Sequence, residues 1–371
     1  MIKFFDLASQ QEVIKKNLDV SLSKVLRNNQ FINGPEVAKL ERMLADVCNV
    51  KDVITCANGT DAISLALMSL ELNVGDAVIV PSFTYVASAE AVAQLGMVPY
   101  FVDVEYSTFN ICVNSVEAAV NDIKKSGLNL GAIIGVDLFG LPCDAQKLKV
   151  IADENSCKLI IDSAQSFGAS INDVKVGNFG HVTTTSFFPA KPLGCYGDGG
   201  AVLTNDLTVG AAVRCKKSHG SGKHKYEHVD IGVNSRLDTI QACILIEKLT
   251  VFEKECKRRD EIARLYNTEF KNFLEVPIID EHSTSVWAQY TVKCNERDGV
   301  KAALQKAGVP SVIYYPKPLH EQPAYQHFPI VNPALSVSER LSAEVLSLPI
   351  HSYLTEAEIE KIIYSVKSFY Q

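Results

Sequence analysis

The chain has 371 residues, of which 47% are hydrophobic and 21% are charged, and its formal net charge at pH 7 is −7. This composition is typical of a soluble globular protein, and the length indicates two domains or one large domain with a lobe. The acidic balance gives no reason to expect nucleic acid or an anionic membrane as a partner.

The first 30 or so residues have a helical pattern, and this segment could pack on either of the units described below. Strands are then predicted at 53–56, 77–81, 98–104, 132–140 and 158–164, followed by VTTTSFF and GGAVLTND. Segments with helical periodicity, such as 61–72 and 145–155, separate most of them. This alternation predicts an α/β fold with a mainly parallel sheet that helices cover on both faces.

The pattern changes after residue 234. A stretch from Arg236 to about Tyr266, nearly free of Gly and Pro, predicts a helix or helix pair that leaves the sheet. A smaller α/β unit follows, with QYTVKC as a strand, 297–307 as a helix closed by Gly308, and VPSVIYYP as a second strand. The last helix begins at TEAE, which is a capping-box pattern.

These patterns predict two domains. The large domain spans 1–250 and includes an N-terminal helical arm, and the small C-terminal domain spans 251–371. Ten scattered cysteines, without a C-x-x-C pair or a nearby Cys/His cluster, indicate reduced thiols in a cytoplasmic protein and no metal site. No run of about 18 apolar residues occurs, so no membrane-spanning helix is expected.

Ligands of open α/β sheets gather beyond the carboxyl ends of the strands. The segment Asn58-Gly59-Thr60-Asp61 follows the first predicted strand and opens a helix. Free backbone N–H groups, the helix dipole and a hydroxyl make this a possible seat for an anion or phosphate. An ordinary capped helix start explains the same residues equally well.

Three predicted strands end in an aspartate: Asp103, Asp137 and Asp162. Each carboxylate could be a structural cap, or it could hold a positively charged atom of a ligand. Position in the sequence does not choose among the three.

Lys191 follows the next strand and stands between Pro189 and Pro192, with no other Lys or Arg between Lys175 and Arg214. A lysine in a dry pocket loses its charge readily and becomes a nucleophilic amine that can form a Schiff base with a carbonyl. A surface lysine on a loop is the alternative. An amine, a carboxylate and a phosphate seat at one strand edge are what pyridoxal phosphate requires.

Two other ligand motifs are excluded. In HGSGKHKY, Lys217 stands where a phosphate-binding loop needs its first glycine and His224 stands where it needs Ser or Thr. No G-x-G-x-x-G opens a first βα turn, which argues against a nicotinamide dehydrogenase.

The segments NGTDAISLAL, PSFTYVASAEAV, DSAQSFGA, TTSFFPAKPLGCYGDGGAVLTND and GVNSRLDTIQA occur in this order. As a set they closely resemble the DegT/DnrJ/EryC1/StrS family of pyridoxal-phosphate-dependent sugar aminotransferases, over nearly the whole chain. The resemblance implies a fold type I architecture like that of aspartate aminotransferase, with a smaller C-terminal α/β domain. Within the family the chain resembles most the WbpE-type enzymes, which aminate the 3-keto position of a UDP-linked N-acetylhexosaminuronic acid.

The resemblance also implies a role for each site. Lys191 would be the Schiff-base lysine and proton shuttle, and Asp162 would pair with the pyridine nitrogen of the cofactor. The other cofactor residues would be Gln165 near the ring hydroxyl, Tyr85 on the ring face, Gly59, Thr60 and Ser186 at the phosphate, and Asn234 from the partner subunit of a homodimer. Members with histidine at the lysine position act as dehydratases, and Lys191 argues against that activity here.

On the substrate side, the resemblance places Tyr315 and His320 along the nucleotide. The planar guanidinium of Arg236 suits the carboxylate of a uronic acid, although Arg236 could instead pair with a backbone carbonyl or with Asp238. The expected reaction moves an amino group from glutamate to the UDP-linked 3-keto sugar, for bacterial surface polysaccharide (O-antigen) biosynthesis. A neutral dTDP- or UDP-linked 3-keto or 4-keto deoxysugar remains an alternative substrate, and a catalytically silent regulator remains the non-enzyme alternative.

Overall fold

The computed structural model describes residues 2–224, 226–332 and 334–371. A seven-stranded sheet in the order β1-β9-β8-β5-β4-β2-β3 forms its centre. The strands are Asp52–Cys56 (β1), Ala77–Pro81 (β2), Val98–Val102 (β3), Leu130–Val136 (β4), Lys158–Asp162 (β5), Val182–Ser186 (β8) and Gly200–Thr204 (β9). Within this sheet β9 is antiparallel to both of its neighbours, and the other pairs are parallel. The predicted α/β fold with a mainly parallel sheet is therefore confirmed.

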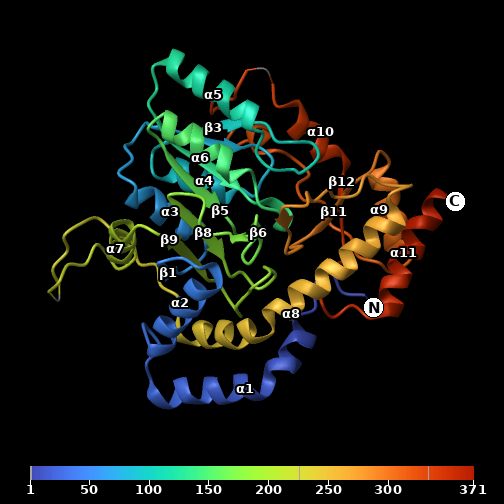
Figure 1. Ribbon diagram of the computed structural model, residues 1–371, viewed down its shortest axis with the longest axis horizontal. Helices are drawn as coiled ribbons and strands as arrows, with labels where there is room; N and C mark the ends of the chain where they lie inside the picture. Colours follow the sequence, from blue (N-terminus) through green and yellow to red (C-terminus); the bar gives the residue numbers. More distant parts are fainter. Residues whose placement is uncertain (1, 225, 333) are drawn as a thin grey trace.

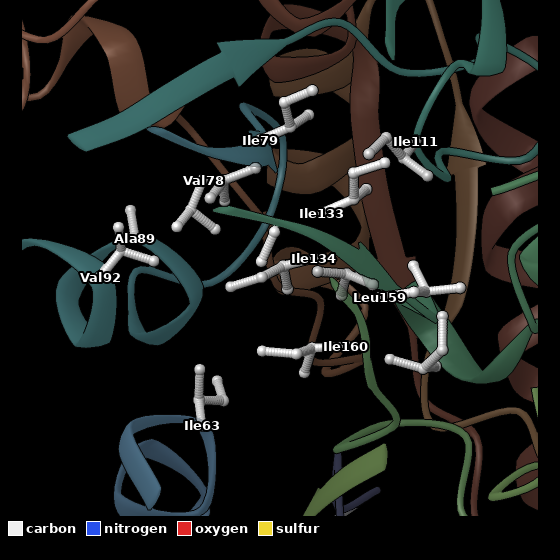
Figure 2. Close-up of a cluster of buried hydrophobic side chains, with 14 of the residues drawn as sticks. Ile63, Val78, Ile79, Ala89, Val92, Ile111, Ile133, Ile134, Leu159 and Ile160 are labelled. Carbon is white, nitrogen blue, oxygen red and sulfur yellow. The ribbon is translucent and has the colours of Figure 1, made fainter. Parts of the chain in front are cut away.

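Strand β2 is apolar along its whole length, as expected of a strand in a sheet with helices on both faces. All five residues of β2, AVIVP, are buried. Figure 2 shows Val78 pointing toward Ala89 and Val92 of α4 (Ala87–Gln94), whereas the next residue, Ile79, points to the opposite face. Ile63 of α3 (Gly59–Ser69) belongs to the same core. Burying a side chain such as Val78, Ile79 or Ile63 contributes about 1.5 to 3 kcal/mol to the stability of the fold. This packing holds the strand edge that carries the candidate site in place.

The remaining helices of the sheet unit lie around this core (Figure 1). They are α2 (Pro35–Cys48), α5 (Val113–Ser126), η1 (Leu138–Gly140), α6 (Ala145–Glu154) and α7 (Leu207–Lys216). A small sheet of β6 (Ser170–Ile171), β7 (Val174–Lys175) and β10 (Ser283–Thr284) joins the unit to the later part of the chain. None of the described helices combines the length and apolar composition needed to cross a bilayer.

A smaller unit follows the long helix α8 (Thr239–Phe270), on the right in Figure 1. Its elements are β11 (Tyr290–Lys293), α9 (Arg297–Lys306), β12 (Val345–Leu348) and α11 (Glu356–Tyr370). Between them in the chain, η2 (Leu319–Glu321) and α10 (Ser336–Glu344) pack on the core of the sheet unit through Leu319 and Leu341. The capping box predicted at the start of the last helix is confirmed, because the side chains of Thr355 and Glu358 each bond the other's backbone N–H. Since α8 is continuous through residue 250, the domain boundary at 250/251 stays a prediction.

One predicted strand was wrong. VPSVIYYP, residues 309–316, makes only one isolated bridge, between Val312 and Ser347, and β11 pairs instead with β12. The tyrosines of this segment pack on other aromatic rings, with Tyr314 6.4 Å from Phe4 between ring centroids and Tyr315 6.1 Å from Phe83. The apolar alternation that resembles a strand therefore serves side-chain packing between the two units.

The N-terminal arm contacts both units. Helix α1 (Leu7–Asn28) packs along α8 through a cluster that contains Ile14, Leu18 and Ile244, and Figure 1 shows the two helices side by side. Ile2, ahead of the helix, lies in the core of the smaller unit. The sequence pattern did not indicate on which of the two units this segment packs, and in the structure it packs on both.

Candidate active site

The ends of three strands meet at one edge of the central sheet. Gly200, the first residue of antiparallel β9, pairs with Cys56 at the end of β1 and with Ser186 at the end of β8. On the other side of β8, Thr184 pairs with Asp162 at the end of β5. The register therefore brings the predicted phosphate seat, Ser186 and one of the three aspartates to the same edge.

The start of α3 lies directly against Ser186. A Cβ added to Gly59 would lie 2.7 Å from the Cβ of Ser186, so this approach requires glycine. Asn58 caps the helix, and its Oδ1 accepts the N–H of Asp61 at 2.8 Å. The first two N–H groups of the helix, those of Gly59 and Thr60, remain available to an external acceptor. With the hydroxyl of Ser186 beside them, they form a seat that suits a phosphate.

Lys191 lies in the loop that follows β8, where its backbone N–H donates to the carbonyl of Phe188 at 2.9 Å. Burial lowers the pKa of the Lys191 amine, and the negative charge of Asp162 partly opposes this effect. The Nζ atom has no hydrogen bond or ion pair with any residue that the structure describes. Lys191 is partly buried, and such surroundings favour the neutral, nucleophilic form of an amine more than exposure to water does.

Asp162 is only 7% exposed. Its Oδ2 accepts the hydroxyl proton of Ser88 at 3.1 Å, and its Oδ1 accepts the N–H of Ala164 at 3.1 Å. Burial raises the pKa of Asp162, and the charge of Lys191 opposes the rise. A buried carboxylate with so little compensation favours a positively charged ligand atom, such as a protonated ring nitrogen. Ser88 was missed, because a serine within α4 carries no distinctive pattern.

The other two strand-end aspartates have structural roles. Asp103 accepts the backbone N–H groups of Val337 at 2.9 Å and Ser338 at 2.8 Å, and so caps α10. Asp137 accepts the hydroxyl proton of Ser166 at 2.6 Å, and burial raises the pKa of this carboxyl to about 6. These contacts account for Asp103 and Asp137 as structural residues, and the pairing of Asp162 with a cofactor stays a prediction.

Gln165 and Tyr315 lie together near Asp162. Gln165 Oε1 accepts the N–H of Phe139 at 2.7 Å, and its Nε2 donates to the hydroxyl of Tyr315 at 3.3 Å. The ring of Tyr315 lies 6.4 Å from that of Tyr85, which is 56% exposed. The two tyrosines thus form an aromatic wall beside the buried glutamine, which suits the predicted place of Tyr85 over a cofactor ring. Tyr315 therefore lies beside Tyr85 and Gln165, and its place along the nucleotide stays a prediction.

Asn234 and Arg236 lie on a different segment, between α7 and α8. Asn234 is exposed, and the guanidinium of Arg236 makes no hydrogen bond or ion pair with Asp238 or with another described residue. Its positive charge contributes to lowering the pKa of Lys217, mainly a result of burial, so another cation lies in its neighbourhood. The structure therefore leaves Arg236 available to an anion and does not bear out its pairing with Asp238.

His320 lies in η2, next to Ser82, the residue that follows β2. Its Nδ1 lies 2.7 Å from the hydroxyl of Ser82, and its Nε2 lies 3.3 Å from Glu339 Oε1. Within the described ranges, His320, Glu321 and Glu339 bring ligand atoms within 4.8 Å of one another. Both glutamates are exposed and the histidine is already bonded, so we assign no metal to this group.

The N-terminal arm supports the lysine loop. Gln10 Nε2 donates to the two carboxylate oxygens of Glu255 at 3.0 and 2.9 Å, and the hydroxyl of Tyr353 donates to the same carboxylate at 2.6 Å. These side chains and residues 189–192 border a cavity of about 50 Å³. Nothing in the sequence indicated this contact, because its members are more than 90 residues apart.

A partly buried amine with no partner among the described residues, a buried carboxylate and a glycine-lined anion seat at one strand edge define the site of a pyridoxal-phosphate-dependent aminotransferase. The residues present fit this cofactor at each point that the geometry can test. The chain belongs to the DegT/DnrJ/EryC1/StrS aminotransferase family, whose model matches residues 12–367.

The chain is similar to individual family members over almost its full length. It is 45% identical over 363 residues to UDP-2-acetamido-2-deoxy-3-oxo-D-glucuronate aminotransferase from Pseudomonas aeruginosa, covering 98% of each chain. A DegT DnrJ EryC1 StrS aminotransferase from Brucella abortus has a TM-score of 0.98 at 48% identity, covering 100% of this chain and 99% of that one. NtdA from Bacillus subtilis, with bound cofactor PMP, has a TM-score of 0.87 at 28% identity, covering 96% and 82%.

Proposed function

We propose that this aminotransferase moves an amino group from glutamate to the 3-keto carbon of UDP-2-acetamido-2-deoxy-3-oxo-glucuronate. The observation that carries the proposal is the guanidinium of Arg236, which has no partner among the described residues and stands two residues from the predicted cofactor contact Asn234. A planar guanidinium recognises a carboxylate through two parallel hydrogen bonds. The 45% identity to the Pseudomonas aeruginosa enzyme supports the same sugar.

Each residue of the site has a task in this reaction. When bound, pyridoxal phosphate supplies an aldehyde carbon and a ring that withdraws electrons from the reacting carbon. Lys191 would hold the aldehyde carbon and move the proton at the reacting carbon, since burial lowers the pKa of its amine and this amine has no hydrogen-bond or ion-pair partner among the described residues. Asp162 would keep the ring nitrogen protonated, and Gly59, Thr60 and Ser186 would hold the phosphate.

We further propose a homodimer in which Asn234 of each subunit completes the partner's cofactor site. The segment that carries it projects away from the body beside α7 (Figure 1). Val229 is 65% exposed and Ile231 is 82% exposed on this segment, and a second copy of the chain would cover them. A cytoplasmic location and a place in surface polysaccharide synthesis stay predictions.

Two alternatives remain to be tested. A neutral 3-keto or 4-keto deoxysugar would leave Arg236 without a carboxylate to bind. A catalytically silent regulator has no need of a partly buried lysine amine that lacks a partner among the described residues, and this feature of Lys191 favours the enzyme.

The test is an assay of purified protein with a panel of nucleotide-linked 3-keto and 4-keto sugars, with glutamate as donor. We expect the 3-keto uronate to be the best substrate, and Lys191→Ala to be inactive while remaining folded. A higher kcat/KM on a neutral sugar would refute the uronate, and turnover by Lys191→Ala would refute the aminotransferase mechanism.

A further inference from the structure

The end of β1 is bonded on both sides of Cys56 to the segment that carries Asn234. The backbone N–H of Ala57 donates to Ser235 Oγ at 3.0 Å. Two residues earlier, the carbonyl of Thr55 accepts Nζ of Lys217 at 2.6 Å. The strand that leads into the phosphate seat and the segment 217–236 are therefore tied together at two points.

Ser235, which makes one of these two hydrogen bonds, is buried and is also held by its backbone. Ser235 is 0% exposed, and its own N–H donates to the carbonyl of Lys217 at 2.9 Å. The next residue back, Asn234, forms an isolated bridge with Ser218. The backbone position of Asn234 is thus fixed relative to the buried hydroxyl of Ser235.

The same hydroxyl is close to the phosphate seat along the chain. Ala57, which it bonds, precedes the helix cap Asn58 and the seat residue Gly59. One side chain therefore stands between two functional elements: the seat that holds a phosphate in this subunit and the asparagine proposed to reach the partner's phosphate.

We propose that Ser235 is a positioning residue that couples the two cofactor sites of the dimer. This inference rests on the proposed function, because it takes Asn234 to serve the neighbouring subunit. Through the hydrogen bond between Ala57 and Ser235, the order of the phosphate seat in one subunit is transmitted to the asparagine that completes the other. Ser235 thereby acts on two sites although it touches neither cofactor.

The substitution Ser235→Ala isolates this hydrogen bond, because it removes the acceptor and leaves the partly buried N–H of Ala57 without it. We expect half-saturation with pyridoxal phosphate to need roughly five- to tenfold more cofactor. Ser235→Thr keeps the hydroxyl and restores affinity. Ser221→Ala, an exposed serine of the same segment whose side chain makes no hydrogen bond to a described residue, leaves affinity unchanged.

Mixed dimers separate the effect of Ser235 on the phosphate seat of its own subunit from its effect on the cofactor site of the partner. A chain that keeps Lys191, called the live chain, is combined with a differently tagged Lys191→Ala chain. Only the site of the live chain can then bind cofactor covalently. The cofactor is then trapped on Lys191 by borohydride reduction, and the labelled fraction is measured by mass spectrometry as a function of cofactor concentration. Ser235→Ala is placed either on the live chain or on the Lys191→Ala chain.

Coupling predicts weaker trapping in both arrangements, whereas Asn234→Ala acts only from the Lys191→Ala chain. If Ser235→Ala acts from the live chain alone while Asn234→Ala behaves as expected, Ser235 only shapes its own seat and the coupling is wrong. Should Asn234→Ala act from the live chain alone, the shared site itself is wrong, and the coupling falls with it.

Discussion

Nζ of Lys248 lies 4.4 Å from the centroid of the Tyr196 ring, and neither the Lys248 amine nor the Tyr196 hydroxyl has a hydrogen-bond partner among the described residues. Lys248 is 1% exposed, and Tyr196 packs on the apolar cluster between α1 and α8. Burial lowers the pKa of Lys248 to about 8. The contact with the ring offsets only part of the cost of burying the charge.

We therefore predict that Lys248→Met stabilises the protein below about pH 8. The unfolded chain holds the lysine proton up to its ordinary pKa of 10.5, whereas the folded protein releases it at about 8. The free energy of unfolding of the wild type should rise with pH across this interval, by about 3 kcal/mol from this residue. Methionine cannot titrate, so the variant lacks the rise.

Denaturant unfolding of both proteins at a series of pH values between about 7 and 10 measures this difference. Lys254→Met, at an exposed position of the same helix, is the matched control and should follow the wild type. Parallel curves for the wild type and Lys248→Met would show that Lys248 is not a buried, destabilising amine.

The second prediction concerns the phosphate seat. Gly59→Ala places a methyl group 2.7 Å from the Cβ of Ser186, so strand β8 and helix α3 must move apart. We expect a loss of about 1 to 3 kcal/mol in unfolding free energy and at least a tenfold weaker affinity for pyridoxal phosphate. Thermal unfolding without cofactor and an absorbance titration with it measure the two effects.

The double variant Gly59→Ala/Ser186→Gly separates crowding from phosphate binding. Removing the Ser186 side chain relieves the clash, so stability should return toward that of the wild type. Affinity for the cofactor should stay low, because the hydroxyl is gone. Full recovery of cofactor affinity would mean that Ser186 does not hold the phosphate.

The third prediction contrasts Asp162 with Asp137, which the sequence did not distinguish. Asp162→Asn should lower kcat by roughly a hundredfold or more, because an amide cannot keep a ring nitrogen protonated, with little loss of stability. Asp137→Asn should cost about 1 to 3 kcal/mol in unfolding free energy, since the buried carboxylate accepts the Ser166 hydroxyl, while folded protein stays active. Measuring kcat and denaturant unfolding for both variants tests the contrast, and the reverse pattern would contradict it.

The strands of the central sheet could be predicted because the apolar pattern of each strand lies within a few consecutive residues. AVIVP and KLIID are apolar runs bounded by polar residues, and each became a buried strand. The lysine and the aspartate at the strand ends followed from the rule that ligands gather there, although the resemblance to a family was needed to choose Asp162. Segment 309–316 shows the limit, because its apolar alternation serves ring packing rather than strand pairing.

The parts of the site that were missed depend on contacts between distant residues. Ser88 donates to Asp162 across 74 positions, and Ala57 donates to Ser235 across 178. Serines are common in helices and loops, so a single sequence carries no signal that marks these two. Packing of the whole fold decides which serine meets a functional group.

The last prediction tests the carboxylate of the sugar. The guanidinium of Arg236 makes no hydrogen bond or ion pair with a described residue, so it is available to bind an anion. A hydrogen bond to a charged group contributes about 1.5 to 3 kcal/mol, so Arg236→Ala should lower kcat/KM for the UDP-linked 3-keto uronate by roughly ten- to a hundredfold. Neutral 3-keto sugars should lose much less. Arg236→Lys keeps the charge without the planar fork, and we expect it to recover only part of the uronate activity. Steady-state kinetics of the three proteins on both substrate classes measure the difference, and equal losses on the two classes would remove the argument for a carboxylate bound at Arg236.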